Sequence, residues 1–205
     1  MLSLFLQGFL LGLPAAAQPG PFQAYLLAQT MKNGWRRTLP AALAPLISDG
    51  PIILLVVLLL TQLPPAFLRA LQIAGALFLL FLAWRAVQSF RHAGFAAPPP
   101  AAAAQQSVLE AALMNLLNPN PYIYWATVTG PILVASWRQS PAHGAAFLLG
   151  FYGTLIGGFA LFIAFFGGAR QLGPRVGRAL TLVSAVALFG FGLDQLSLGL
   201  GLLPA

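Results

Sequence analysis

Apolar residues run along the chain in six long stretches, and most of the polar and charged residues lie in the short segments between them. A transmembrane helix needs about 20 apolar residues to cross a hydrocarbon core of about 30 Å. The predicted spans are residues 3–28, 39–61, 66–88, 107–136, 142–166 and 177–203. The pattern therefore predicts an all-α integral membrane protein with six transmembrane helices.

Proline tetrapeptides interrupt the first and fourth stretches near their middles. They are Gln18-Pro19-Gly20-Pro21 and, one hundred positions later, Asn118-Pro119-Asn120-Pro121. Proline has no backbone N–H and its ring clashes with the preceding turn, so such a pair stops a helix and lets another begin. We therefore expect helices 1 and 4 to be broken at mid-membrane, where irregular backbone needs protein or a water-filled cavity around it.

The two halves of the chain carry similar markers in the same order. Besides the prolines, Arg69-Ala70-Leu71 opens the third stretch and Arg178-Ala179-Leu180 opens the sixth. Three spans in each half force the second copy to lie upside down, which predicts an inverted 3+3 repeat. The predicted units are residues 1–90 and 107–205, joined by a flexible, cytoplasmic, Pro/Ala-rich linker at 91–106.

Composition supports a membrane protein. The chain has 205 residues, of which 59% are hydrophobic and only 6% are charged, too few to cover a soluble domain of this size. There is no cysteine, which excludes disulfides and thiolate metal sites. The first stretch ends in an Ala-rich segment like a secretion-signal cleavage site, but no basic residue precedes Lys32 and the apolar run resumes at Phe22. We expect a retained helix.

The basic residues are distributed unevenly between the two ends of the predicted helices. The other ends of the helices hold only Arg69 and Arg138. The connectors after spans one, three and five, together with the adjoining helix ends, hold eight basic residues: Lys32, Arg36, Arg37, Arg85, Arg91, Arg170, Arg175 and Arg178. Positive residues favour the cytoplasmic side of a membrane, so those connectors should be cytoplasmic and both termini extracytoplasmic. Basic residues placed in this way set topology, and we expect no nucleic-acid partner.

Polar residues of four spans fall at one depth. At a rise of about 1.5 Å per residue, the midplane lies about ten residues from either end of a span. The candidate substrate-binding residues at that depth are Gln18, Pro19, Gly20, Pro21, Asp49, Asn118, Asn120, Pro121, Tyr152 and Thr154. Their common depth predicts a single site for a small polar molecule.

Asp49 is the acid at the centre of the second span. A carboxylate at mid-bilayer costs about 2.5–3.5 kcal/mol, so it normally faces a cavity and serves an ion or a proton. We expect Asp49 to carry a coupling proton or to meet a substrate ammonium group. The alternative is a structural aspartate that is hydrogen-bonded to a neighbouring Asn or Gln.

The helix breaks have a chemistry of their own. The amides that start new half-helices at Pro21 and Pro121 attract carboxylates, with the helix dipole assisting. Together with side-chain amides at the same level, they suit a zwitterion whose ammonium lies near Asp49. Alternatively, the prolines only kink the helices and the amides hold them together. The aromatic residues that either wall this site or pack in the core are Tyr122, Tyr124 and Trp125.

The remaining acids have simpler explanations. Glu110 follows Ser107 in the expected first turns of span four, where a helix N-terminus favours negative charge, although a role at the inner mouth is the alternative. Asp194 is expected to be interfacial or paired with Gln195, unless it has a functional role. Arg85 is expected to extend to the cytoplasmic surface.

Three motifs point to a family: Gly8 through Gly12 leading to Pro19-Gly20-Pro21, Asp49 in span two, and Asn118-Pro119. The combination resembles the lysine exporter (LysE-type) family of bacterial amino-acid efflux carriers, over essentially the whole chain. The resemblance implies a proton-coupled secondary transporter in the bacterial cytoplasmic (inner) membrane. It would export an amino acid or a similar metabolite by alternating access, with no enzymatic activity and no cofactor.

Two other classes remain open. A metal or inorganic-ion exporter of related architecture would need several carboxylates or histidines, and only one acid lies at the midplane. A non-transporting membrane subunit is the second.

The expected partners are substrate, protons and lipid. A homo-oligomer through Gly8-x-x-x-Gly12 and Gly153-x-x-x-Gly157 is a further alternative, although such patterns more often pack helices within one chain.

Overall fold

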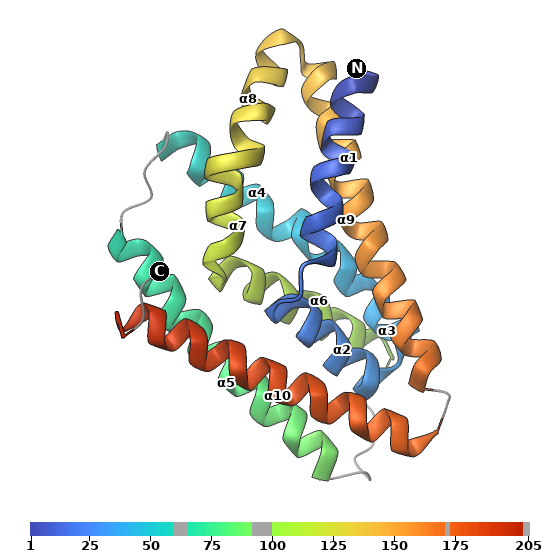
Figure 1. Ribbon diagram of the computed structural model, residues 1–205. Coiled ribbons are helices and arrows are strands. Elements are labelled where there is room, and N and C mark those ends of the chain that lie inside the picture. Colours follow the sequence, from blue (N-terminus) through green and yellow to red (C-terminus); the bar gives the residue numbers. More distant parts are fainter. Residues whose placement is uncertain (60–64, 92–99, 171–172, 203–205) are drawn as a thin grey trace.

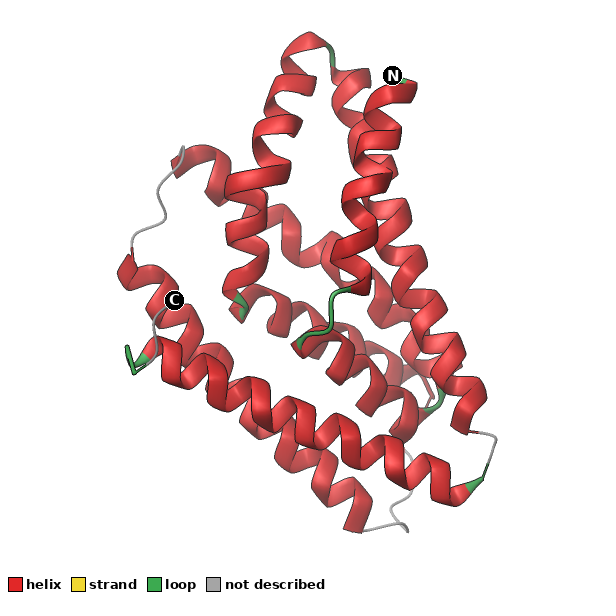
Figure 2. Ribbon diagram, in the orientation of Figure 1, coloured by secondary structure: helices red, strands yellow, loops and turns green. Residues whose placement is uncertain are grey.

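The computed structural model describes residues 1–59, 65–91, 100–170 and 173–202, and this part of the chain is helical apart from short junctions (Figures 1 and 2). The elements are α1 (Leu2–Ala17), α2 (Pro21–Asn33), α3 (Trp35–Thr38), the 3₁₀ turn η1 (Leu39–Leu43), α4 (Ala44–Leu59), α5 (Pro65–Arg91), α6 (Pro100–Leu117), α7 (Pro119–Tyr124), the π-helical turn η2 (Trp125–Thr129), α8 (Gly130–Gln139), α9 (Pro141–Arg170) and α10 (Pro174–Gly199). No strand occurs in these ranges, in agreement with the predicted all-α class.

Several helices are long and apolar enough to cross a membrane. They are the stretches Trp35–Val56, Arg69–Gln88, Pro141–Ala169 and Arg175–Gly199, together with the pair α1 and α2, which is bent by 65°. They correspond to five of the six predicted spans and make this a multi-pass membrane protein. The fourth predicted span, 107–136, is divided among α6, α7, η2 and α8, so the count of six and the inverted repeat remain predictions.

The first helix break lies at the first proline tetrapeptide. Gln18 and Gly20 are extended between α1 and α2, and Pro21 is the first residue of α2. The Nε2 of Gln23 donates to the carbonyl oxygen of Ala16 at 3.0 Å. A side chain of the second half-helix therefore satisfies a carbonyl that the break leaves without its helical partner.

The second break is bridged in a similar way, although α7 begins at Pro119 and not at the predicted Pro121. Asn118 is extended between α6 and α7, and its Oδ1 accepts from the backbone N–H of Asn120 at 3.1 Å. The Tyr122 hydroxyl donates to the carbonyl oxygen of Leu116 at 2.9 Å. At each break, a side chain that follows the break therefore donates to a carbonyl group that precedes it. The accepting carbonyl lies two residues before Gln18 at the first break and two residues before Asn118 at the second.

Helices from the two predicted halves of the chain pack against each other. α1 lies along α9, α5 along α10 and α4 along α6, so each pair joins one half of the chain to the other (Figure 1). Glycine allows α1 and α9 to lie this close together, because a Cβ on Gly12 would lie 2.6 Å from the carbonyl oxygen of Phe151. The Gly8-x-x-x-Gly12 pattern therefore packs α1 against α9 within the chain. Gly153 and Gly157 have no atom within 4 Å of such a Cβ, and the homo-oligomer remains a prediction.

Two predicted connectors differ from the structure. Residues 100–106 of the predicted flexible linker form the start of α6, because alanine has the highest helix propensity and proline suits a first helical position. The connector 29–38 is largely helical as well, with a turn at Gly34, whose φ is 83°. Other predicted connector residues, 62–64, 92–99 and 171–172, lie outside the described residues.

The α1–α9 contact predicts a contrast between two glycines of α9. A Cβ on Gly150 would collide with the backbone of Phe5, whereas one on Gly153 would meet nothing within 4 Å. We expect Gly150→Ala to destabilise the protein by about 1–3 kcal/mol through overpacking. Gly153→Ala should be neutral or slightly stabilising because alanine favours helix. Thermal unfolding in detergent measures the stability of both variants. Equal effects of the two substitutions would contradict the close contact between α1 and α9 at Gly150.

Candidate functional site

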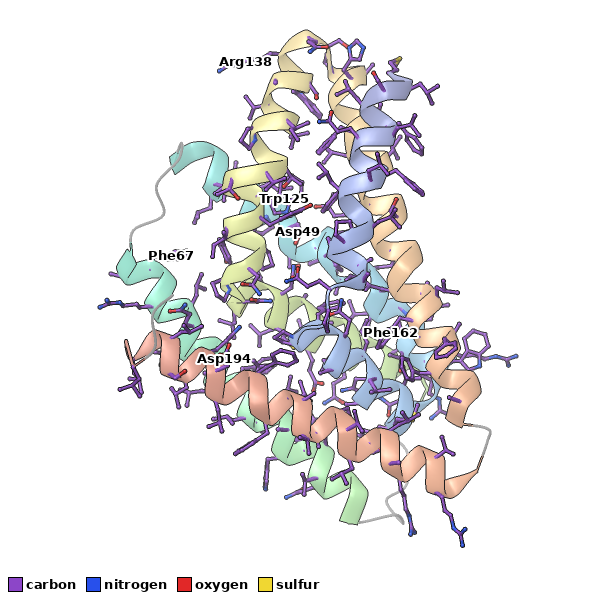
Figure 3. The ribbon with its side chains drawn as sticks, viewed as in Figure 1. Asp49, Phe67, Trp125, Arg138, Phe162 and Asp194 are labelled. Atoms are coloured by element: carbon purple, nitrogen blue, oxygen red, sulfur yellow. The ribbon has the colours of Figure 1, made fainter. Side chains whose placement is uncertain are left out.

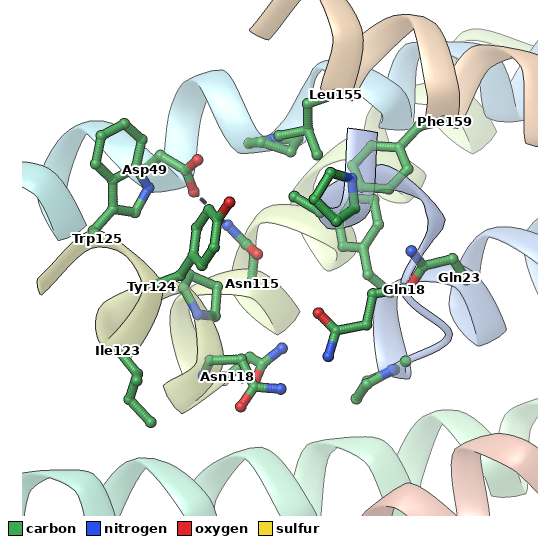
Figure 4. A pocket seen from close by; sticks show the side chains of 18 of the residues that line it. Gln18, Gln23, Asp49, Asn115, Asn118, Ile123, Tyr124, Trp125, Leu155 and Phe159 are labelled. Carbon is green, nitrogen blue, oxygen red and sulfur yellow. Dashed lines mark hydrogen bonds between the residues drawn. The ribbon is translucent and has the colours of Figure 1, made fainter. Parts of the chain in front are cut away.

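A cavity of about 340 Å³ lies between the two helix breaks (Figure 4). α1, α2, α4, α6, α7 and α9 all contribute to its wall. Eight of the ten predicted binding residues line it: Gln18, Pro19, Gly20, Pro21, Asp49, Asn118, Asn120 and Pro121. The structure therefore brings both proline tetrapeptides and the acid of the second span to one place.

Asp49 is held by three donors from outside its own helix. It lies in α4 and is 4% exposed. Its Oδ1 accepts from Asn115 Nδ2 at 2.7 Å, and its Oδ2 accepts from the Tyr152 hydroxyl at 3.0 Å. The Trp125 side chain, which lies beside it at the centre of the molecule, also hydrogen-bonds to it (Figures 3 and 4). These bonds offset part of the cost of burying a carboxyl group.

Asn115 is the main site residue absent from the sequence-based set. It lies on α6, lines the cavity and is 9% exposed. Its Nδ2 donates to Ser48 Oγ at 2.7 Å as well as to Asp49. The available signal is its position almost one helical turn before the break at Asn118, which places it on a neighbouring part of the cavity wall.

Tyr152 and Thr154 lie differently from the prediction. Tyr152 hydrogen-bonds to Asp49 but is not among the residues that line the cavity. Thr154 donates to the carbonyl oxygen of Gly150 at 2.9 Å and lines a second, mainly apolar cavity among α1, α2, α9 and α10. With about 3.6 residues per turn, positions two apart on α9 face different sides, so a common depth does not imply a common cavity.

Amide and aromatic groups complete the wall of the first cavity. Gln23 joins Gln18 on the side opposite Asp49 (Figure 4). Tyr124 and Trp125 line the cavity, as one of the two interpretations of these aromatics predicted, and the Tyr124 hydroxyl donates to the carbonyl oxygen of Leu11 at 3.0 Å. Tyr122 instead serves the second break, as described above.

The two half-helix starts differ in their capping. The Asn118 side chain caps the start of α7, whereas no side chain caps the start of α2 at Gly20. The first residues of α2, Pro21 to Gln23, line the cavity. Free amides and the positive end of the helix dipole therefore make α2 the start that suits an anionic group.

A second polar group, here called the Glu110 cluster, consists of Tyr25, Gln29, Arg85, Gln106 and Glu110. The carboxylate of Glu110 accepts from the Tyr25 hydroxyl and from Gln29 Nε2, both at 3.0 Å, and from Gln106 Nε2 at 2.9 Å. It also forms an ion pair with Arg85. The cluster joins α2, α5 and α6.

This cluster corrects two expectations. Glu110 is not in the first turns of its helix, because α6 begins at Pro100. Arg85 does not simply extend toward the surface: its side chain is 24% exposed and pairs with Glu110, whose side chain is 12% exposed. The alternative explanation of Glu110, a role at the inner mouth, remains a prediction.

Within the described part of the chain, no hydrogen bond joins the side chains of Asp194 and Gln195, so the predicted pairing of these two residues is wrong. Asp194 is exposed on α10, far from the central acid (Figure 3). Gln195 is 7% exposed and directs its Nε2 to Asn118 Oδ1 at 3.4 Å, while its Oε1 has no partner among the described residues. Gln195 is therefore a support of the second break.

The site and the fold define a class of protein. Among the described residues, no three His, Asp or Glu side chains lie close enough to hold a metal ion. A cavity that carries polar groups between broken helices in a multi-pass membrane protein is typical of transporters. The model of the LysE type translocator family matches residues 13–199, and the chain belongs to this family. No curated protein and no solved structure gives a significant match.

Membership of this family confirms the resemblance noted from the motifs. The protein is a transporter and not an enzyme, and its substrate is a small molecule. The family indicates efflux of amino acids or related compounds. A non-transporting membrane subunit is therefore no longer a competing interpretation.

The Arg85–Glu110 pair predicts a measurable coupling. Alanine at either position leaves a half-buried charge without its partner, so the double substitution should cost less than the sum of the two single ones. We expect an interaction energy of about 0.5–3 kcal/mol from a double-mutant cycle on unfolding in detergent. Gln106→Ala, which removes an exposed member of the cluster, serves as a weaker reference. Purely additive costs would show that the pair contributes nothing.

Proposed function

We propose that the protein exports an amino acid or a similar small zwitterion across the bacterial cytoplasmic membrane, coupled to protons, by alternating access. The observation that carries this proposal is the cavity that two helix breaks enclose around the buried Asp49. An ionisable residue inside a membrane protein that faces a cavity marks an ion or substrate pathway.

The two charged ends of a zwitterion find different partners in the cavity. The uncapped start of α2 suits the carboxylate, and Asp49 suits the ammonium group. Gln18, Gln23 and Asn118 lie along the cavity wall and offer both donors and acceptors. Asn120 lines the cavity too, although its backbone N–H is used in capping α7.

Proton coupling follows from competition for one carboxylate. When the substrate ammonium group leaves, Asp49 loses its counter-charge in a buried site, and proton uptake neutralises it. A proton that leaves Asp49 restores the charge that attracts the next ammonium group. Asn115, Tyr152 and Trp125 hold the carboxyl group in place through this exchange.

Alternating access requires the two sides of the cavity to open in turn. The Glu110 cluster joins α2 to α6, and these two half-helices meet the cavity at Pro21 and at Asn115. On the predicted topology this cluster is cytoplasmic to the cavity, so its intact bonds would keep the inner side closed. In the proposed cycle, α2 and α6 separate there while the predicted inverted 3+3 repeat exchanges its two arrangements.

The lining favours an organic substrate over a metal or inorganic ion. Asp49 is the only carboxylate among the lining residues, which include no histidine, and the other polar lining groups are mainly neutral amides. Hard cations are bound by several carboxylate or carbonyl oxygens, and transition metals by imidazole or thiolate. An ion exporter therefore remains the weaker alternative.

Asp49→Asn tests the coupling role. The substitution keeps the shape of the side chain but removes the titrating carboxylate, so we expect correct folding and loss of proton-driven transport, by at least tenfold. Proteoliposomes with an imposed pH gradient and radiolabelled amino acids measure this. Asp194→Asn is the matched control, since Asp194 is exposed on α10, and should transport normally. Normal transport by Asp49→Asn would reject the proton-coupling role.

Orientation can be tested on a chain without native cysteine. Gln139, at the end of α8, and Gln105, in α6, are both exposed and lie at opposite ends of the predicted topology. We expect Gln139→Cys to react with a membrane-impermeant maleimide on whole cells, and Gln105→Cys to react only after permeabilisation. The reverse pattern would place both termini in the cytoplasm.

A further inference from the structure

We propose that the cavity selects a zwitterion with an uncharged, apolar side chain, and that Phe22, Leu155 and Phe159 determine this specificity. The inference rests on the proposed function and goes beyond it by naming the substrate class. It derives from the charges and the apolar surface that the described residues place around the cavity.

The charge of the lining matches a zwitterion and no further charge. Asp49 is the only ionisable carboxyl group among the lining residues, and they include no Lys, Arg or His. Among the described lining residues, the uncapped start of α2 is the group proposed above for the carboxylate. A basic side chain would bring a second positive charge with no second carboxylate, and an acidic one would bring a second negative charge with no cation. Burying an unpaired charge is strongly unfavourable.

Neighbouring charges are occupied elsewhere. Glu110, which lies five positions before Asn115 on α6, accepts hydrogen bonds from three side chains and pairs with Arg85. Neither residue lines the cavity. The Glu110 cluster therefore offers no free carboxylate to a lysine-like substrate and no free cation to a glutamate-like one.

An apolar wall lies beside the proposed carboxylate site. Phe22, Leu155 and Phe159 are each less than 9% exposed, and the ring centroids of Phe22 and Phe159 are 4.7 Å apart. Phe159 lies on the same side of the cavity as Gln18 and Gln23, and Leu155 lies between Phe159 and Asp49 in this view (Figure 4). Because Phe22 is the second residue of α2, a substrate whose carboxylate binds the start of α2 presents its side chain to this wall.

The size of the cavity suits one amino acid. Its volume of about 340 Å³ lies at the small end of the range of about 300–1,000 Å³ for small-molecule sites. A branched aliphatic side chain such as that of leucine can cover the apolar wall, whereas the methyl group of alanine leaves most of it uncovered. Contacts of this kind discriminate by about 10–200-fold per methylene.

Competition in proteoliposomes tests the substrate class. The wild-type protein is loaded with unlabelled leucine, and counterflow of radiolabelled leucine is measured with alanine, lysine or glutamate as competitors. We expect leucine to compete at least tenfold better than each of the other three. Equal competition by lysine would overturn this inference while leaving an amino-acid transporter intact. Failure of every neutral, basic and acidic amino acid to be exchanged would instead overturn the proposed function.

Leu155→Ala tests the wall itself. Removing most of its side chain should weaken leucine exchange at least tenfold and leave alanine exchange within about twofold. Leu149→Ala, an exposed leucine on the same helix, is the matched control and should change neither. Phe159→Leu, a smaller change, should shift the ranking in the same direction if Leu155→Ala does not fold. If exchange of leucine and exchange of alanine fell equally in these variants, Leu155 and Phe159 would not determine which substrate side chain is accepted.

Discussion

The lack of hydrogen-bond partners in lipid is the constraint on which this structure depends. Two helices stop at proline tetrapeptides, and every backbone group freed there has to be satisfied by protein or by water in a cavity. Gln23 and Tyr122 return across the two breaks to bond carbonyl groups, and Asn118 caps the start of α7. The breaks are thereby fixed, and the polar groups that surround them enclose a cavity instead of facing lipid.

The breaks, most of the spans and the central acid were predictable because their signals are local. Proline fixes where a helix stops, hydropathy fixes which stretches can enter a membrane, and a lone carboxylate within such a stretch is conspicuous. Asn115 and Gln23 were not predicted, since their roles depend on how α6 and α2 are rotated about their axes. Thr154 shows the converse: its place along the fifth predicted span could be read from the sequence, but the side of α9 that it faces depends on packing against α1.

Two polar layers share one helix. Asn115 of α6 holds Asp49, and Glu110, five positions earlier on the same helix, binds groups of α2 and α5. A shift or rotation of α6 therefore changes both layers together, because an α-helix moves largely as a rigid unit. One helix therefore carries both the Asn115 contact with the central carboxyl group and the contacts of the Glu110 cluster. Coupling between sites requires such an element with two arrangements, and α6 is placed to be one.

The pairing of α1 with α9 and of α5 with α10 has a consequence for biosynthesis. The ribosome delivers the first three spans well before the helices on which they finally pack. Until α9 emerges from the translocon, the glycine surface of α1 has only acyl chains or insertion machinery against it. The amino-terminal helices therefore cannot reach their final packing before the last helices have been synthesised.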